Sequence, residues 1–410
     1  MSRVNLSHRV LIYILCTAVF IAACTKRAVT PKYSYNSGST TITDSTAADS
    51  TATFNEPTAL AVDASGNIFV ADYGNNLIRE VSASGAVTTV AGSGMQGAVN
   101  TIAANASFNG PTGLCLDASD NIYIADNNNN QIRMISSGNV TTIAGSDSIG
   151  AVDGIGANAY FFGPTGIVND GNGNLYVTDA GNNLIRKVVP STGQVTTVAG
   201  NTNPSFANGA LLSASFNNPS GIAIDGSGNL YVGDMLNNMI REVNLTSQMV
   251  TTVAGNTDTT EDLNGPDSTA LFYYPTGVAV DANGNIFVAE YVTNVIREIS
   301  ANGSVTTFAG NGQAGWVDSA GTKAEFNGPS GLAIDKAGNL YVADTYNNVI
   351  RKITPAGVVS TVAGNGNAGA ANGKALSLRR RSNLAHLLIK PSFNRKTLDK
   401  IFIKKRRRRH

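Results

Sequence analysis

The chain has 410 residues, of which 14% are charged, and it contains 43 glycines and one tryptophan. Few charges and many glycines are typical of a β-rich, turn-rich exported protein and argue against a largely helical one. The net charge of +1 is an average of two unlike parts. Residues 24–373 hold 13 basic and 27 acidic residues, whereas residues 374–410 hold 14 basic residues and one acid.

Residues 1–23 are predicted to be a secretory signal peptide. Arg3 and Arg9 precede a fourteen-residue apolar run over residues 10–23, which is short for a membrane-spanning helix. The run ends in Ile-Ala-Ala-Cys, which resembles the lipobox of bacterial lipoproteins, where Cys24 would be acylated. An ordinary signal peptide followed by a chance cysteine is the alternative. The sequence therefore predicts export and a lipid anchor in the bacterial cell envelope, at the outer membrane or facing the periplasm.

Residues 24–53 are rich in Ser, Thr and Ala and have no apolar face. This composition predicts a flexible tether between a membrane and the rest of the protein. Alternatively, residues 40–43 pair with the edge of a sheet.

Six imperfect copies of one unit follow the tether. Each copy contains an arginine, and successive arginines are 53 to 56 residues apart. Self-similarity at such a period indicates a repeat architecture, in which no unit buries its apolar face alone. The copies lie near residues 54–92, 108–145, 161–200, 216–255, 272–310 and 326–364.

The last copy shows the expected secondary structure most clearly. Four short alternating runs, at residues 330–334, 339–343, 348–353 and 358–363, are separated by turn residues such as Asp-Lys-Ala-Gly. Four strands per unit, repeated six times, fit radial repetition around an axis. We therefore predict an all-β fold, a six-bladed β-propeller of four-stranded antiparallel blades over residues 54–373.

The repeated words are Phe-x-x-Pro-x-Gly, Asp-x-x-Gly-Asn, Ala-Asp-x-x-Asn-Asn-x-Ile-Arg and Thr-Thr-Val-Ala-Gly. This signature resembles the NHL repeat over residues 54–364. The resemblance implies a six-bladed propeller used mainly for binding, as in sensor domains of bacterial receptor kinases and in RNA- or protein-binding propellers. Related propellers include lactonases and lyases, so the fold alone leaves the chemistry open.

Two acids recur in every unit. The first precedes a Gly-Asn turn, where its side chain can bind backbone amides, and it is predicted to be structural. The second stands seven residues before the repeat arginine and is predicted to form a partly buried ion pair with it. These structural pairs are Asp72 with Arg79, Asp126 with Arg133, Asp179 with Arg186, Asp234 with Arg241, Glu290 with Arg297 and Asp344 with Arg351.

Residues 24–373 contain no histidine, which removes the commonest catalytic base and zinc ligand of enzymatic propellers. Small residues on the first strand should let the strands approach the axis without projecting reactive groups there; they are Ala59, Gly113, Gly166, Gly221, Gly277 and Gly331. We predict no catalytic residue and no cofactor. The alternative is a calcium-dependent hydrolase of the lactonase type.

Two other sequence patterns have residue types that can bind ligands. Four carboxylates, Asp258, Glu261, Asp262 and Asp267, could gather a calcium ion, although a solvated loop is the commoner outcome for such a group. Three loops satisfy G-x-G-x-x-G, but each leads to a further strand and not to the helix that a dinucleotide site requires. We therefore predict no metal site and no nucleotide site.

Side chains vary most in the loop between the second and third strands. Exposed aromatic and Met side chains on a rigid scaffold favour binding, and the candidate ligand-binding residues are Tyr73, Met235, Tyr291, Tyr346 and Trp316. The alternative is a set of scattered apolar surface residues with no partner. The prediction is a non-enzymatic, monomeric binding or scaffold propeller whose partner is a protein or glycan and not a nucleic acid.

Beyond residue 373 the repeat pattern stops. The expected Phe-Asn-x-Pro never appears, glycine is absent and basic residues dominate. This segment is predicted to be a disordered tail or the product of a shifted reading frame. A basic arm for nucleic acid or anionic lipid is the competing interpretation.

Overall fold

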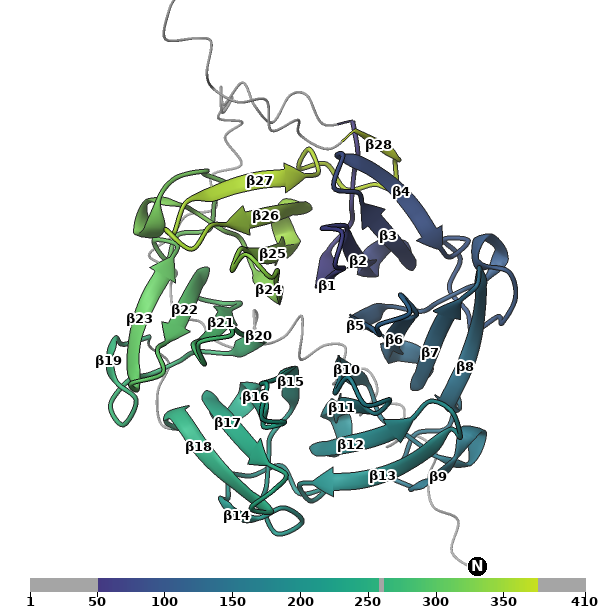
Figure 1. The fold of residues 1–410 in the computed structure, drawn as a ribbon, viewed down its shortest axis with the longest axis horizontal. Coiled ribbons are helices and arrows are strands. Elements are labelled where there is room, and N and C mark those ends of the chain that lie inside the picture. The colour runs from purple at the N-terminus through teal and green to yellow at the C-terminus, as the bar shows by residue number, and fades with distance from the viewer. Residues whose placement is uncertain (1–50, 258–261, 375–410) are drawn as a thin grey trace, which may run out of the picture. The chain divides into compact units, whose positions relative to one another are not determined.

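Residues 51–257 and 262–374 are described by the computed structural model, and they form six antiparallel sheets around a central axis (Figure 1). In every sheet, four strands follow one another in chain order from the axis outward. The predicted all-β, six-bladed β-propeller is confirmed.

The six blades have closely similar strand lengths. The first three contain β1 (Pro57–Val62), β2 (Ile68–Asp72), β3 (Leu77–Val81) and β4 (Ala86–Ala91); β5 (Pro111–Leu116), β6 (Ile122–Asp126), β7 (Gln131–Ser136) and β8 (Asn139–Gly145); and β10 (Pro164–Asn169), β11 (Leu175–Asp179), β12 (Leu184–Val189) and β13 (Gln194–Ala199). The last three contain β15 (Pro219–Ile224), β16 (Leu230–Asp234), β17 (Met239–Asn244) and β18 (Met249–Gly255); β20 (Pro275–Val280), β21 (Ile286–Glu290), β22 (Val295–Ile299) and β23 (Ser304–Ala309); and β24 (Pro329–Ile334), β25 (Leu340–Asp344), β26 (Val349–Ile353) and β27 (Val359–Ala363).

Two-residue strands from the connections between blades cover the outer edge of several sheets. These are β9 (Gly154–Ile155), β14 (Gly209–Ala210), β19 (Gly265–Pro266) and β28 (Gly373–Lys374). In the second and sixth blades, single bridges Ile102–Asn139 and Ala320–Val358 lie at the corresponding place. Each outer strand is therefore paired at one end, over one or two residues, which shortens its unpaired edge.

Tight turns join the first and second strands of each blade. In the sixth blade, the Asp335 carboxylate accepts hydrogen bonds from the amides of Ala337 and Asn339 and from the Asn339 side chain, at 2.9, 2.8 and 2.7 Å. Partial burial alone would raise the pKa of Asp335, but these hydrogen bonds hold it below its ordinary value. The acid before the Gly-Asn turn is structural, as the pattern predicts.

The hydrophobic core lies between neighbouring blades. In one cluster, Phe69 and Ala71 of the first blade pack with Leu114 and Ile124 of the second. In the second blade the innermost strand requires glycine at position 113, because a Cβ added there would overlap the carbonyl oxygen of Thr165 in the next blade. The small residues of the first strand therefore allow close packing of neighbouring blades near the axis.

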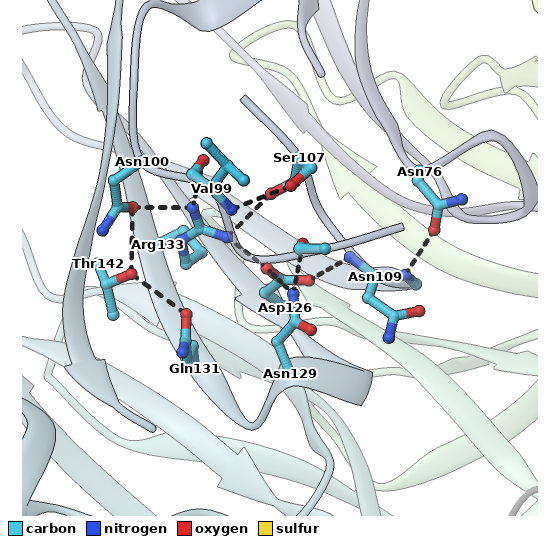
Figure 2. Close-up of polar contacts among 12 residues, drawn as sticks. Asn76, Val99, Asn100, Ser107, Asn109, Asp126, Asn129, Gln131, Arg133 and Thr142 are labelled. Atoms are coloured by element: carbon cyan, nitrogen blue, oxygen red, sulfur yellow. Dashed lines mark hydrogen bonds and ion pairs between the residues drawn. The ribbon is translucent and has the colours of Figure 1, made fainter. Parts of the chain in front are cut away.

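A buried arginine organises each blade, as Figure 2 shows for the second. The Arg133 guanidinium donates to the Asp126 carboxylate at 2.6 Å and to the carbonyl oxygen of Ser107 at 3.1 Å. It also donates to the carbonyl oxygen of Val99 at 3.2 Å and to the Asn100 side chain at 2.8 Å. Arg133 thus joins two strands of its blade to the connection that arrives from the previous blade.

The same ion pair is present in all six blades, as the seven-residue spacing predicts. The nitrogen–oxygen distances are 2.6 to 2.9 Å, and both side chains of every pair are fully buried. Each guanidinium also lies over the buried Phe that opens its repeat, at 5.0 to 5.4 Å from the ring centre.

Burial opposes the charged form of the paired acids. It raises the pKa of Asp72 and of Asp179 to about 6 and that of Glu290 to about 7, although the neighbouring arginine and hydrogen-bond donors act to lower these values. Removing water from the carboxylate is therefore costly. In the second blade, the hydrogen bonds from the terminal guanidinium nitrogens of Arg133 to three further acceptors offset part of this cost, whereas its buried Nε makes no hydrogen bond.

The two ends of the described chain close the ring. Arg79 of the first blade donates to the carbonyl oxygen of Ala371 and to the Asn372 side chain, both at 3.0 Å. The strand β28 then pairs with β4. Residues 51–53, which the sequence assigns to the tether, belong to this closure, because the Thr53 carbonyl oxygen accepts from Arg79 and Ala52 is fully buried.

We expect Arg297→Ala to lower the free energy of unfolding by about 3–5 kcal/mol at pH 8, because it leaves Glu290 buried without its cation. Loss of the ion pair raises the pKa of Glu290 further above its unfolded value of 4.5. The deficit relative to wild type should therefore shrink as the pH falls from 8 through about 7, the pKa of Glu290 in the wild type, since a protonated Glu290 needs no cation. Urea unfolding at pH 8 and pH 5 measures this, and an unchanged deficit would contradict it.

A chain that ends at Lys374 should melt within a few degrees of the full chain, because it keeps every acceptor of Arg79. A chain that ends at Ala370 should lose about 3 kcal/mol or more of unfolding free energy, since two hydrogen bonds from a buried cation are removed together with β28. Calorimetry of the two truncated chains makes the comparison. Equal melting temperatures would show that the closing segment does not stabilise the ring.

Candidate binding site

The loops between the second and third strands lie on the same face as the connections between blades. In the first blade, Pro57 at the start of β1 pairs with Asp72 at the end of β2, so the chain enters the blade beside the loop that follows Asp72. The corresponding Pro–acid pairing recurs in the other five blades. We call this side of the ring the loop face.

Each of these loops is a short turn that ends in an asparagine with left-handed backbone. Five are 3-10 helices: η2 (Tyr73–Asn75), η4 (Asn127–Asn129), η6 (Ala180–Asn182), η7 (Met235–Asn237) and η9 (Thr345–Asn347). The terminal asparagine then accepts, through its side-chain oxygen, the amide of a residue in the next blade; for Asn76 this is the amide of Gly110, at 2.9 Å. The last such bond, from the Glu56 amide to Asn348, joins the first and sixth blades. The loop face is thus held in place by six inter-blade hydrogen bonds.

Two of the predicted ligand-binding residues lie together on the loop face. The Tyr291 and Tyr346 rings, from the fifth and sixth blades, have centres 5.4 Å apart and are tilted by 54°. Both rings lie over Gly328, where an added Cβ would lie 2.7 Å from Tyr346. Tyr346 is 45% exposed. The pair therefore presents an aromatic surface that spans two blades.

The other three predicted residues are not part of this pair. Met235 is buried, with 6% exposure, so it offers no exposed anchor. Tyr73 is partly buried and packs against Gly110 between the first and second blades. Trp316 donates from Nε1 to the Thr361 hydroxyl at 2.8 Å and packs against Gly366.

Two further tyrosines, which are not among the predicted ligand-binding residues, lie beside Tyr291. Tyr273 and Tyr274 occupy the position between the repeat Phe and Pro where two other blades have Asn-Gly. Their rings meet edge to face at 4.7 Å, and the Tyr274 carbonyl oxygen accepts the Tyr291 amide at 3.5 Å. Burial, and then the neighbouring Tyr273, raise the pKa of Tyr274. The departure from Phe-Asn-x-Pro was the signal that could have found them.

Hydroxyl groups near the axis are engaged in holding neighbouring blades together. Thr58 donates to the Pro111 carbonyl oxygen at 3.2 Å, and Thr112 donates to that of Pro164 at 3.1 Å. Ser330 donates to the Thr58 carbonyl oxygen at 3.0 Å, which continues this pattern across the closure of the ring. These side chains have a structural role.

Of the four carboxylates considered for calcium, Asp258 and Glu261 lie outside the described residues. Asp262 and Asp267 are exposed. Within residues 51–257 and 262–374, no group of three or more His, Cys, Asp or Glu side chains is placed to hold a metal ion. The first G-x-G-x-x-G loop, which begins at Gly92, is followed by the three-residue 3-10 helix η3 (Ala103–Asn105).

Several predictions fall on residues that the structure does not describe. They are the signal peptide, Cys24, the tether over residues 24–50 and the basic tail from residue 375. Among the described residues, no helix is long and apolar enough to cross a membrane.

Known proteins contain the same repeat that the sequence of this chain shows. The NHL repeat family matches residues 54–80, 108–133, 272–296 and 326–353. NHL repeat-containing protein 2 of Bos taurus is 28% identical over 333 residues, which cover 72% of this chain and 46% of that protein. Protein SUPPRESSOR OF QUENCHING 1, chloroplastic, of Arabidopsis thaliana is 31% identical over 191 residues, which cover 43% of this chain and 18% of that protein. The chain thus spans less than half the length of these two relatives.

Among solved structures, an auxiliary nutrient binding protein from Bacteroides thetaiotaomicron has a TM-score of 0.55 and 16% identity, over 75% of this chain and 70% of that one. At this identity the likeness concerns the fold alone. Together with the matched repeats and the six-bladed ring, it leads to one conclusion. The chain carries NHL repeats, which the family model matches in four of the six units, on a six-bladed β-propeller fold.

Proposed function

We propose that the protein is a non-enzymatic binding propeller of the bacterial cell envelope, which holds a protein or glycan partner on its loop face. The observation that carries the proposal is the contact between Tyr291 and Tyr346 on adjacent blades. Partly exposed aromatic side chains on a rigid frame supply contact area at a small cost in conformational entropy. The inter-blade hydrogen bonds of the loop-face asparagines provide that frame.

The composition of the propeller also supports a binding role. Residues 24–373 contain no histidine, and the hydroxyls nearest the axis are used between blades. Variation between the units is instead concentrated on the loop face, where aromatic residues replace the Asn and Gly of other units. Binding sites are commonly built in this way, with variable loops on an invariant scaffold.

Tyr291→Ala and Tyr346→Ala should each weaken capture of an envelope partner by about 1–3 kcal/mol if the two rings are binding hot spots. Thermal stability should change little, because both side chains lie at the surface of the propeller. Quantitative pull-down from envelope extracts with the full chain measures capture, and Asn128→Ala, at the position of Tyr346 on the second blade, is the matched control.

The rival activity is tested on the same proteins. Calcium-dependent hydrolysis of lactones or esters that is kept in the double-alanine variant and abolished by a chelator would overturn the binding proposal. If the wild type and the double-alanine variant capture the partner equally well, the partner does not bind at the loop face.

Anchoring in the envelope rests on the Ile-Ala-Ala-Cys sequence that ends at Cys24. Cys24→Ser should release the protein from the membrane fraction, because no thiol remains to be acylated. Fractionation and incorporation of a labelled fatty acid measure this. Membrane association of the Ser variant, with no label in wild type, would contradict the lipid anchor.

A further inference from the structure

One sector of the loop face combines strained backbone with the tyrosine pair. The residue before the repeat Pro has a left-handed backbone in every blade: Glu56, Gly110, Gly163, Asn218, Tyr274 and Gly328, with φ between 51° and 63°. Gly and Asn adopt this conformation at low cost, whereas Tyr and Glu do not. Tyr274 and Glu56 are therefore the two costly residues of the set, and they belong to the fifth and first blades.

Both strained residues adjoin the sixth blade. On one side, the Tyr274 carbonyl oxygen accepts the Tyr291 amide, and the Tyr291 ring contacts Tyr346. On the other side, the Glu56 amide donates at 2.9 Å to Asn348, two residues after Tyr346. Strained backbone of this kind is found more often at functional sites than elsewhere. We call Tyr274, Tyr291, Tyr346 and Glu56 the tyrosine sector.

The charge of the propeller indicates what this sector would attract. The described residues hold 23 acids and 11 basic residues, of which six acids and six arginines form the buried pairs. The remainder is 17 acids and five lysines. Glu56 adds an exposed acid to the sector itself. Such a surface draws cations toward it and repels polyanions.

Tyrosine rings complement the same kind of ligand. The faces of an aromatic ring carry partial negative charge, so ammonium and guanidinium groups bind over them. A cation bound at Tyr346 can keep its charge near solvent, while its methylene groups cover the ring. An acid at the edge of the sector would add charge-assisted hydrogen bonding.

We propose that the tyrosine sector binds a basic peptide segment of a protein partner, with a lysine or arginine side chain over the tyrosine pair and its charge toward Glu56. The inference rests on the binding role proposed above and names its partner chemistry. In this arrangement Tyr274 supports the Tyr291 loop through its carbonyl oxygen and is a positioning residue.

Calorimetric titration of the full chain at low salt tests the proposal with four probes: hexa-arginine, hexa-lysine, hexa-glutamate and cellohexaose. The two basic peptides should bind, and hexa-glutamate and cellohexaose should not. Tyr346→Phe keeps the ring and should bind as wild type does, whereas Tyr346→Leu keeps bulk without the ring and should bind at least about fivefold more weakly. Glu56→Gln should weaken binding by several fold and make it less sensitive to salt.

Controls separate the sector from general attraction to an acidic protein. Asn128→Ala should bind the basic peptides as wild type does. Tyr274→Gly should raise the melting temperature, because glycine adopts the left-handed backbone freely, and should leave peptide binding unchanged, because the carbonyl oxygen that accepts the Tyr291 amide is kept. A variant that is no more stable would contradict the strain at Tyr274, and one that binds more weakly would contradict a role confined to its carbonyl oxygen.

Equal binding of hexa-arginine by wild type, Tyr346→Leu and Asn128→Ala would overturn the proposal, as would ring-dependent binding of cellohexaose in place of the basic peptides. If capture from envelope extracts still depends on Tyr291 and Tyr346 in that case, the binding function stands and only the cationic partner is wrong. If that capture is independent of both tyrosines, the binding role of the loop face fails as well.

Discussion

The buried ion pair between the repeat arginine and the acid seven residues before it is the interaction on which the propeller depends. Burial works against it, as the raised pKa values of Asp72, Asp179 and Glu290 show. The arginine compensates by binding four acceptors at once, three of which belong to the connection from the previous blade. A lysine, with a single nitrogen, could not span these acceptors in the same planar geometry. The pair therefore specifies how one blade follows another.

The closure of the ring uses the same bonds. In the first blade, the connection that supplies acceptors to Arg79 comes from residues 371 and 372, at the other end of the propeller. Asn348, the loop-face asparagine of the sixth blade, likewise accepts a hydrogen bond from the amide of Glu56 in the first blade. Closure therefore needs no special element, because the two ends of the repeat array complete one ordinary blade junction.

The two ends of the blades differ in how much variation they tolerate. The turns after the first strand are held by an aspartate that is satisfied within the turn, and they change little between units. On the loop face, the asparagine fastens the loop to the next blade, so the preceding side chains are free to differ. The strained Tyr274 and the Tyr291–Tyr346 pair lie on this face, where the side chains differ between units.

The sequence by itself determined the blade number, the four strands of each blade and the six ion pairs, because these depend on period, alternation and spacing within one unit. It also located Tyr291 and Tyr346 as variable positions. Only the tertiary structure decided which variable side chains meet, since neighbours on the loop face come from different blades, more than 50 residues apart along the chain. Met235 has the same sequence position as Tyr291 and yet is buried. Tyr274 departs from the Phe-Asn-x-Pro pattern in the sequence, but its strain is a property of backbone conformation, and a φ of 56° is visible only in three dimensions.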